Sequence, residues 1–186
     1  MKIIGITGGI GSGKSTFCGF LAAMGVPVFE CDSQVKRLYK EDTEFAKWVA
    51  ENILEETFSG ELSLKRLSYV VFSHPEKLAA LEEQVFKRLT PRLEAWIASQ
   101  NTPAVVIESA ILNKVPEIAA LCGTIVEVTS EKAMERAAAR DGVSIGAINK
   151  RAQVQQRFDA DIIIRNDGSL EELHEEAKNF YNLYCK

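Results

Sequence analysis

The sequence contains no long apolar run and no excess of positive charge. Apolar runs are short: residues 104–107, for example, end at Glu108, whereas a membrane-spanning helix needs about 18 consecutive apolar residues. The 22 Lys and Arg residues are outnumbered by 26 Asp and Glu residues, which gives a net charge of −4. A mildly acidic chain lacks the basic surface that binds nucleic acid or anionic membranes. We therefore expect neither as a partner.

Paired cysteine motifs and a secretory signal are also lacking. The four cysteines, at positions 18, 31, 122 and 185, never form the C-x-x-C spacing that is typical of zinc sites. The first eight residues contain neither a long apolar stretch nor a small-residue cleavage site. Free thiols and the missing signal predict a cytoplasmic location.

The pattern that is present predicts an α/β protein. Apolar residues make up 46% of the 186 residues, enough to bury a core. Short β-branched runs alternate with longer helical stretches, which is typical of a parallel sheet covered by helices on both faces. The predicted strands are Lys2–Thr7, Val26–Phe29, Ala104–Glu108, Gly123–Val128 and Ile162–Arg165.

Helical stretches fill the intervals between these strands. Gly25 and the Ser169–Glu172 capping box mark helix ends, and Pro91 is expected to kink or split its helix. The predicted helices are Lys14–Met24, Phe45–Leu54, Leu64–Phe72, Pro75–Ser99, Ser130–Arg140 and one that opens at Ser169. We expect one domain, with its core in residues 1–31, 102–129 and 159–186, a helical insertion at 32–101 and a small helical lid at 130–158.

Residues 8–16 read GGIGSGKST and match the pattern G-x-x-x-x-G-K-[ST] of a phosphate-binding loop (P-loop). The motif follows a predicted strand and opens a predicted helix, as its chemistry requires. Glycines let successive backbone N–H groups converge on phosphate oxygens, and the helix N-terminus favours anions. Lys14 can reach the terminal phosphates, and the Ser15 hydroxyl can bind Mg²⁺. The motif predicts a nucleoside triphosphate site at Gly11, Ser12, Gly13, Lys14, Ser15 and Thr16.

Other P-loop classes lack support in the sequence. Neither Asn-Lys pair continues to the N-K-x-D of a GTPase, and no Asp is followed by Gly three positions later. The L-S-G-G-Q motif of transport ATPases is absent. A small-molecule kinase with a helical acceptor-binding insertion and a lid remains.

Carboxylates and arginines complete the expected kinase site. Asp32 follows the second predicted strand, where it can deprotonate an acceptor hydroxyl, help to hold Mg²⁺, or cap the helix at 33–40. Glu108 ends the third strand and has either a site role or a structural one. Arg136 and Arg140 share one helix face, as lid cations or as a solvated face.

Longer stretches resemble the dephospho-CoA kinase family. The resemblance rests on residues 5–16 (GITGGIGSGKST), on residues 25–32 (GVPVFECD) with Arg37, and on the acceptor-domain signature around residues 60–72 and 81–92. It continues through Arg136, residues 140–142, Arg151, Gln153, residues 160–161 and 166–168. Thr90 stands where the family usually has histidine, Leu64 where arginine is common, and Arg157 where a lid lysine is expected.

The resemblance implies a P-loop NTPase-type three-layer fold and an activity. The enzyme would transfer phosphate from ATP, with Mg²⁺, to the ribose 3′-hydroxyl of dephospho-CoA in the last step of coenzyme A biosynthesis. Asp32 would be the catalytic base, Lys14 and Arg140 would act on the triphosphate, Arg136 would support the lid, and Asn166 would lie near the adenine. Ser15 and Asp32 would hold the metal. A kinase for another small acceptor and a non-catalytic nucleotide-binding regulator remain alternatives.

Overall fold

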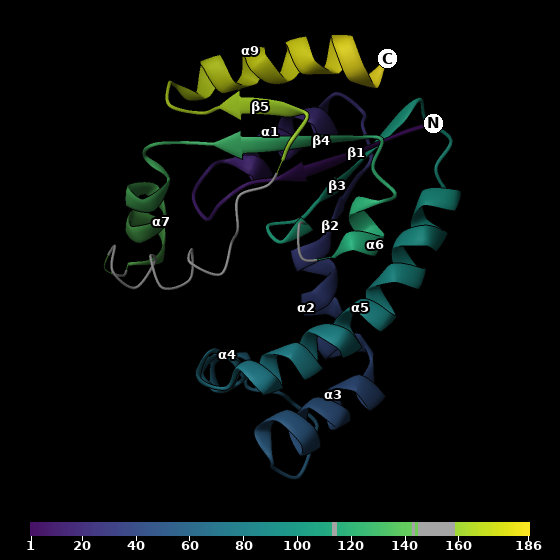
Figure 1. Ribbon diagram of the computed structural model, residues 1–186, viewed down its shortest axis with the longest axis vertical. Coiled ribbons are helices and arrows are strands. Elements are labelled where there is room, and N and C mark those ends of the chain that lie inside the picture. The colour runs from purple at the N-terminus through teal and green to yellow at the C-terminus, as the bar shows by residue number, and fades with distance from the viewer. Residues whose placement is uncertain (113–114, 143, 145–158) are drawn as a thin grey trace. The chain divides into compact units, whose positions relative to one another are not determined.

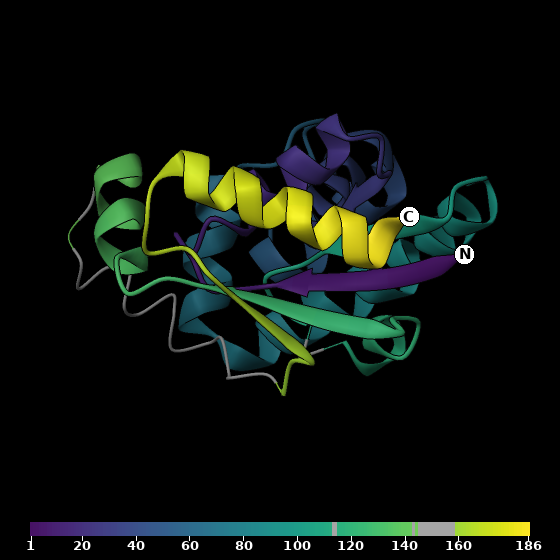
Figure 2. The same ribbon diagram turned by 90° about the horizontal axis from the view of Figure 1, so that it is seen from above.

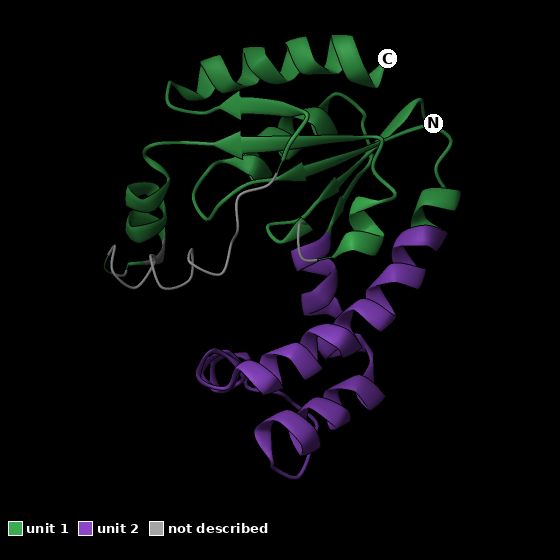
Figure 3. Cartoon of the chain, in the orientation of Figure 1, with its two compact units in different colours: residues 1–30, 96–186 green, residues 31–95 purple. Residues whose placement is uncertain are grey.

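The computed structural model describes residues 1–112, 115–142, 144 and 159–186, and these form two compact units. Unit 1 comprises residues 1–30 and 96–186, and unit 2 comprises residues 31–95 (Figure 3). Among these described residues, no helix is both long and apolar enough to cross a bilayer.

Unit 1 is built on a five-stranded sheet in which all strands are parallel (Figure 1). The strands are β1 (Lys2–Thr7), β2 (Val28–Glu30), β3 (Ala104–Glu108), β4 (Thr124–Thr129) and β5 (Ile162–Arg165). Their order is β2-β3-β1-β4-β5. Ile6 pairs with Glu108 and Glu30 pairs with Glu108, so β1, β2 and β3 end at the same edge. The predicted α/β fold with a five-stranded parallel sheet is confirmed.

Helices cover the sheet on both faces. On one face, α1 (Lys14–Ala23) and α9 (Leu170–Phe180) pack over a core that includes Ile4, Val126 and Ile164. In Figure 2, α9 (yellow) lies over the sheet and runs roughly along the strands. On the other face, Leu112 and Cys122 approach Gly5 so closely that a side chain there would meet both. Other elements of this unit that the structure describes are α6 (Pro116–Ala119), α7 (Ala133–Asp141) and η3 (Tyr181–Cys185), a π-helical turn.

Most predicted helix ends agree with the structure. The Ser169–Glu172 capping box is present: Ser169 Oγ accepts from the Glu172 N–H, and Glu172 Oε2 accepts from the Ser169 N–H. Three predicted starts are wrong. The helix α3 begins at Thr43, two residues before the predicted Phe45, because Asp42 caps it. The helix α2 begins at Cys31, so Asp32 lies inside its first turn and does not cap it. The helix α7 begins three residues after Ser130, whose Oγ instead accepts from the Lys132 N–H in a turn.

All the secondary structure of unit 2 is helical. It consists of α2 (Cys31–Glu41), α3 (Thr43–Val49), the π-helical turn η1 (Ala50–Leu54), α4 (Leu64–Ser73) and most of α5 (Pro75–Ala98). Apolar residues four positions apart on α5, among them Leu81 and Val85, join Leu38 and Phe45 in the core of this unit. The predicted split at Pro91 does not occur, because α5 continues through it. Pro91 has no N–H to donate to the Lys87 carbonyl. Both residues are exposed, so solvent can hydrate that carbonyl.

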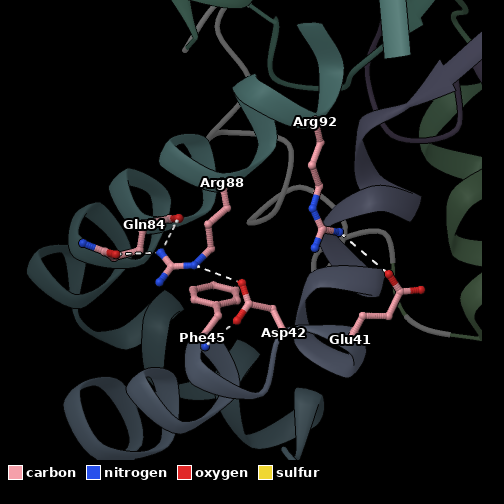
Figure 4. Close-up of polar contacts among 6 residues, drawn as sticks. All are labelled: Glu41, Asp42, Phe45, Gln84, Arg88 and Arg92. Carbon is pink, nitrogen blue, oxygen red and sulfur yellow. Dashed lines mark hydrogen bonds and ion pairs between the residues drawn. The ribbon is translucent and has the colours of Figure 1, made fainter. Parts of the chain in front are cut away.

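Two carboxylates join the corner between α2 and α3 to α5 (Figure 4). Glu41 Oε2 lies 3.8 Å from Arg92 Nη1, and Asp42 makes the closer contacts. Asp42 Oδ1 accepts from the Phe45 N–H at 2.9 Å and caps α3, while Oδ2 lies 3.3 Å from Arg88 Nε. The Arg88 guanidinium stacks over the Phe45 ring at 4.7 Å and donates to Gln84 Oε1 at 2.7 Å. Because a capping bond, an ion pair and a cation–π contact share these side chains, they support one another.

Replacing Asp42 with Ala is expected to lower the free energy of unfolding by about 1–2 kcal/mol, because both the cap and the partner of Arg88 are lost. Asp42→Asn keeps an oxygen for the cap and should lose less. Urea unfolding measures both, with Glu44→Ala in the same helical turn as a control for charge. Equal stability of Asp42→Ala and wild type would contradict this account.

Candidate active site

The P-loop connects β1 to α1 and takes a backbone path that requires glycine at two positions. Gly11 and Gly13 have φ angles of 80° and 94°, which side chains rarely tolerate. The space that a side chain would fill is also occupied: the Ala133 carbonyl oxygen lies against Gly11, and the amide nitrogen of Asn166 lies against Gly13. The loop is therefore packed between its own helix and the segments that follow β4 and β5.

The start of α1 is suited to bind an anion. Within the described part of the chain, no side chain caps this helix, and its first turn carries no acidic residue. The first N–H groups of a helix have no partner within it and carry partial positive charge. The exposed side chains of Ser15 and Thr16 lie in this first turn. A phosphate group fits this arrangement.

Glu108 joins the two polar side chains that follow the loop. Ser15 Oγ donates to Glu108 Oε1 at 2.7 Å, and Lys14 Nζ lies 3.4 Å from the same oxygen. The side chains of Lys14 and Glu108 are only 12% and 7% exposed, so solvent screens their attraction little. A lysine, a hydroxyl and a carboxylate therefore meet at the C-terminal edge of β1 and β3.

Asn166 and Arg136 lie behind the loop. Asn166 is buried, and its Nδ2 donates to the Ser12 carbonyl at 2.8 Å. Arg136 donates from a guanidinium nitrogen to the Asn166 carbonyl at 2.9 Å. The Ser12 hydroxyl is buried and has no hydrogen-bond partner among the described residues. The structure thus brings together three predicted nucleotide-site residues, Ser12, Arg136 and Asn166, through polar contacts.

Two more predicted site residues, Arg140 and Asp32, are exposed. Arg140 follows Arg136 by one turn of α7 and is exposed. Asp32 is exposed in the first turn of α2, in unit 2. Arg151, Gln153 and Arg157 lie outside the described residues.

Cys18 lies one turn beyond Lys14 and is buried. Burial raises the pKa of its thiol well above the ordinary value, and the negative charge of Glu108 raises it further, while Lys14 partly offsets this. The thiol therefore stays protonated at neutral pH, and Cys18 is not a nucleophile of this site.

Comparison with known proteins gives this geometry a context. The family model described as dephospho-CoA kinase matches residues 2–172. The chain belongs to the dephospho-CoA kinase family. A curated dephospho-CoA kinase from Chlorobium luteolum is 35% identical over 198 residues, which cover 97% of this chain and 90% of the relative. One from Thermus thermophilus is 34% identical, over 95% of this chain and 88% of the relative.

A solved structure has the same fold. A crystal structure from Thermus thermophilus has a TM-score of 0.83 and 30% identity, with 100% of this chain and 98% of that chain covered. Dephospho-CoA kinases convert dephospho-CoA to coenzyme A with ATP, so the protein is a kinase of this family. Two of the expected departures from the family pattern lie in unit 2: Leu64 is exposed at the start of α4, and Thr90 is half-buried in α5.

Glu108 is the main site residue on which sequence reasoning reached no decision. Its position at a strand end was the available signal, but a structural role explained that position equally well. The order β3-β1 places Glu108 beside the loop that follows β1. The contact of Asn166 with Ser12, 154 positions away, had no local signal.

Glu108→Gln is expected to raise the affinity for ATP without metal by roughly tenfold, because it removes a negative charge that lies close to Lys14 and keeps the side chain's size. Calorimetric titration with ATP in the presence of a chelator measures the change. Glu127→Gln, half-buried on β4, is the matched control. Unchanged affinity would show that Glu108 does not compete with phosphate for Lys14.

Proposed function

We propose that this protein transfers the γ-phosphoryl group of Mg·ATP to the ribose 3′-hydroxyl of dephospho-CoA. The observation that carries the proposal is the uncapped start of α1 with Lys14 and Ser15 gathered at Glu108, in a chain of this family.

The P-loop residues bind the triphosphate and orient it. Backbone N–H groups at Gly11–Thr16 donate to the β- and γ-phosphates, and Lys14 offsets the negative charge that builds up during transfer. To do so, Lys14 exchanges its contact with Glu108 for phosphate oxygens.

The same place offers oxygen ligands for a metal. The Ser15 hydroxyl and the Glu108 carboxylate, 2.7 Å apart, are hard oxygen donors of the kind that Mg²⁺ prefers. We assign Ser15 and Asp32 as the Mg²⁺ ligands. Glu108 lies beside Ser15 at the C-terminal edge of the sheet. When bound, Mg²⁺ neutralises charge on the transferring phosphate.

Asp32 is assigned as the general base. It follows Glu30, the last residue of β2, by two positions, and ligands of parallel α/β sheets bind at the carboxyl ends of strands. Its carboxylate takes the proton from the 3′-hydroxyl as the oxygen attacks phosphorus. Exposure in the free protein leaves it accessible to the acceptor.

Two further predicted segments bind the acceptor and close the active site. Residues 32–101 provide the acceptor domain, and residues 130–158 provide the lid, with Arg140 on the triphosphate and Arg136 in support. The loop that begins at Asn166 lies near the adenine. Cytoplasmic location and the lack of a nucleic-acid partner stay predictions of the sequence.

An acceptor panel tests the proposal. The purified protein with Mg·ATP is offered dephospho-CoA, AMP, adenosine and shikimate in parallel, and each product is identified by mass and phosphorus NMR. We expect phosphate on the ribose 3′ oxygen of dephospho-CoA. Preference for another acceptor, or for the 2′ oxygen, would remove the assignment and keep a P-loop kinase. No turnover with any acceptor would favour a nucleotide-binding regulator.

Asp32→Asn separates a base from a structural carboxylate. An amide cannot accept the proton, so kcat should fall by about 10²–10⁴. Stability should change by less than about 1 kcal/mol, because an exposed acidic residue in a first turn contributes little. Glu76→Gln, in the first turn of α5, makes the same chemical change and should leave kcat unchanged. A folded Asp32→Asn variant with normal kcat would make Asp32 structural.

A further inference from the structure

A single buried side chain reaches the backbone of the P-loop from the far end of the chain. Asn166 directly follows β5, is 7% exposed, and donates from Nδ2 to the Ser12 carbonyl at 2.8 Å. A carbonyl has no hydrogen to give, so the atom that faces it must be the amide nitrogen of Asn166. The direction of this hydrogen bond is therefore fixed by chemistry.

This bond sets the orientation of the peptide between Ser12 and Gly13. A trans peptide is planar, and its C=O and N–H groups point in opposite directions. Since the Ser12 carbonyl points at Asn166, the Gly13 N–H points away from Asn166. Asn166 approaches Gly13 so closely that a side chain at position 13 would collide with its amide. The hydrogen bond of Asn166 to Ser12 therefore requires glycine at position 13.

Asn166 is itself held from several sides. Its N–H donates to the Thr129 carbonyl at 2.8 Å, and its carbonyl accepts from Arg136 at 2.9 Å. The next residue, Asp167, accepts from the Glu131 N–H at 2.7 Å. These bonds attach the loop after β5 to the end of β4 and the start of α7. The Ser12–Gly13 peptide is thus fastened to a rigid frame.

We infer that Asn166 is a positioning residue for the P-loop: its amide holds the Ser12 carbonyl so that the Gly13 N–H faces the triphosphate. A carbonyl turned toward phosphate would repel it, whereas an N–H donates to it. Arg136 supports this arrangement through the Asn166 carbonyl. The inference rests on the proposed binding of ATP at the P-loop.

The substitutions Asn166→Asp and Asn166→Ala test this role. Aspartate has nearly the same shape but offers an acceptor to the Ser12 carbonyl, which favours rotation of the peptide and withdraws the Gly13 N–H. We expect KM for ATP to rise by about tenfold or more, the scale of one lost hydrogen bond to a charged group. KM for dephospho-CoA should stay within about twofold, because the Gly13 N–H is assigned to the triphosphate and not to the acceptor.

The amide resonance of Gly13 in ¹⁵N-labelled protein gives a readout that general loss of stability does not move. On addition of ATP it should shift strongly in wild type and weakly in both variants. Ser169→Ala serves as the control, because it removes the capping box of α9 and leaves Asn166 in place. This control should lose stability and keep the wild-type shift of Gly13.

The wild-type protein offers a second measurement that needs no variant. A scalar coupling across the hydrogen bond from Asn166 Nδ2 to the Ser12 carbonyl should be present with and without ATP. Loss of this coupling in the ATP complex would overturn the inference, as would wild-type KM and Gly13 shifts in the variants. If Gly13 of the wild type fails to respond to ATP, the proposed phosphate site itself is wrong.

Discussion

The parallel hydrogen bonds between β1 and β3 bring together groups that lie 93 positions apart in the chain. Their register pairs Ile6 with Glu108, so β3 ends beside the loop that leaves β1. A shift by one residue would turn the Glu108 side chain to the opposite face of the sheet. Both the partner of Lys14 and the hydrogen bond of Ser15 depend on this pairing.

A second layer of constraint lies behind the P-loop. The backbone of Gly11 touches Ala133 and that of Gly13 touches Asn166, so the loop is shaped by the segments that follow β4 and β5 as well as by its own glycines. Local flexibility at glycine would otherwise cost entropy when phosphate binds. Because the contacts with Ala133 and Asn166 order the loop during folding, this entropy is lost before the nucleotide binds.

Much of the fold could be predicted, because its signals are local. Buried parallel strands give continuous apolar runs, and the bounds of β1, β3 and β5 agree with the prediction. The strand β2 was placed two residues early, since only three residues of it pair with β3. The start of α7 was misjudged because Ser130 has the chemistry of a cap but closes a turn instead.

In the candidate site, too, residues with a local sequence signal could be predicted, and contacts between distant parts of the chain could not. The P-loop is a contiguous motif, so its residues were found directly. Glu108 could be nominated but not assigned, because its partners depend on strand order, which the sequence does not encode locally. The contact between Asn166 and Ser12 joins opposite ends of the chain and becomes visible only when β4 and β5 are in place.

The raised pKa of the Cys18 thiol affects how readily oxidants react with it. Oxidants such as peroxide react with thiolates, and the first product, a sulfenic acid, is larger and more polar than the thiol. A reactive cysteine on the buried face of α1 would make phosphate binding sensitive to redox conditions. Burial among apolar side chains, together with the nearby Glu108 charge, raises the pKa of the Cys18 thiol, and a buried, protonated thiol is a poor target for such oxidants.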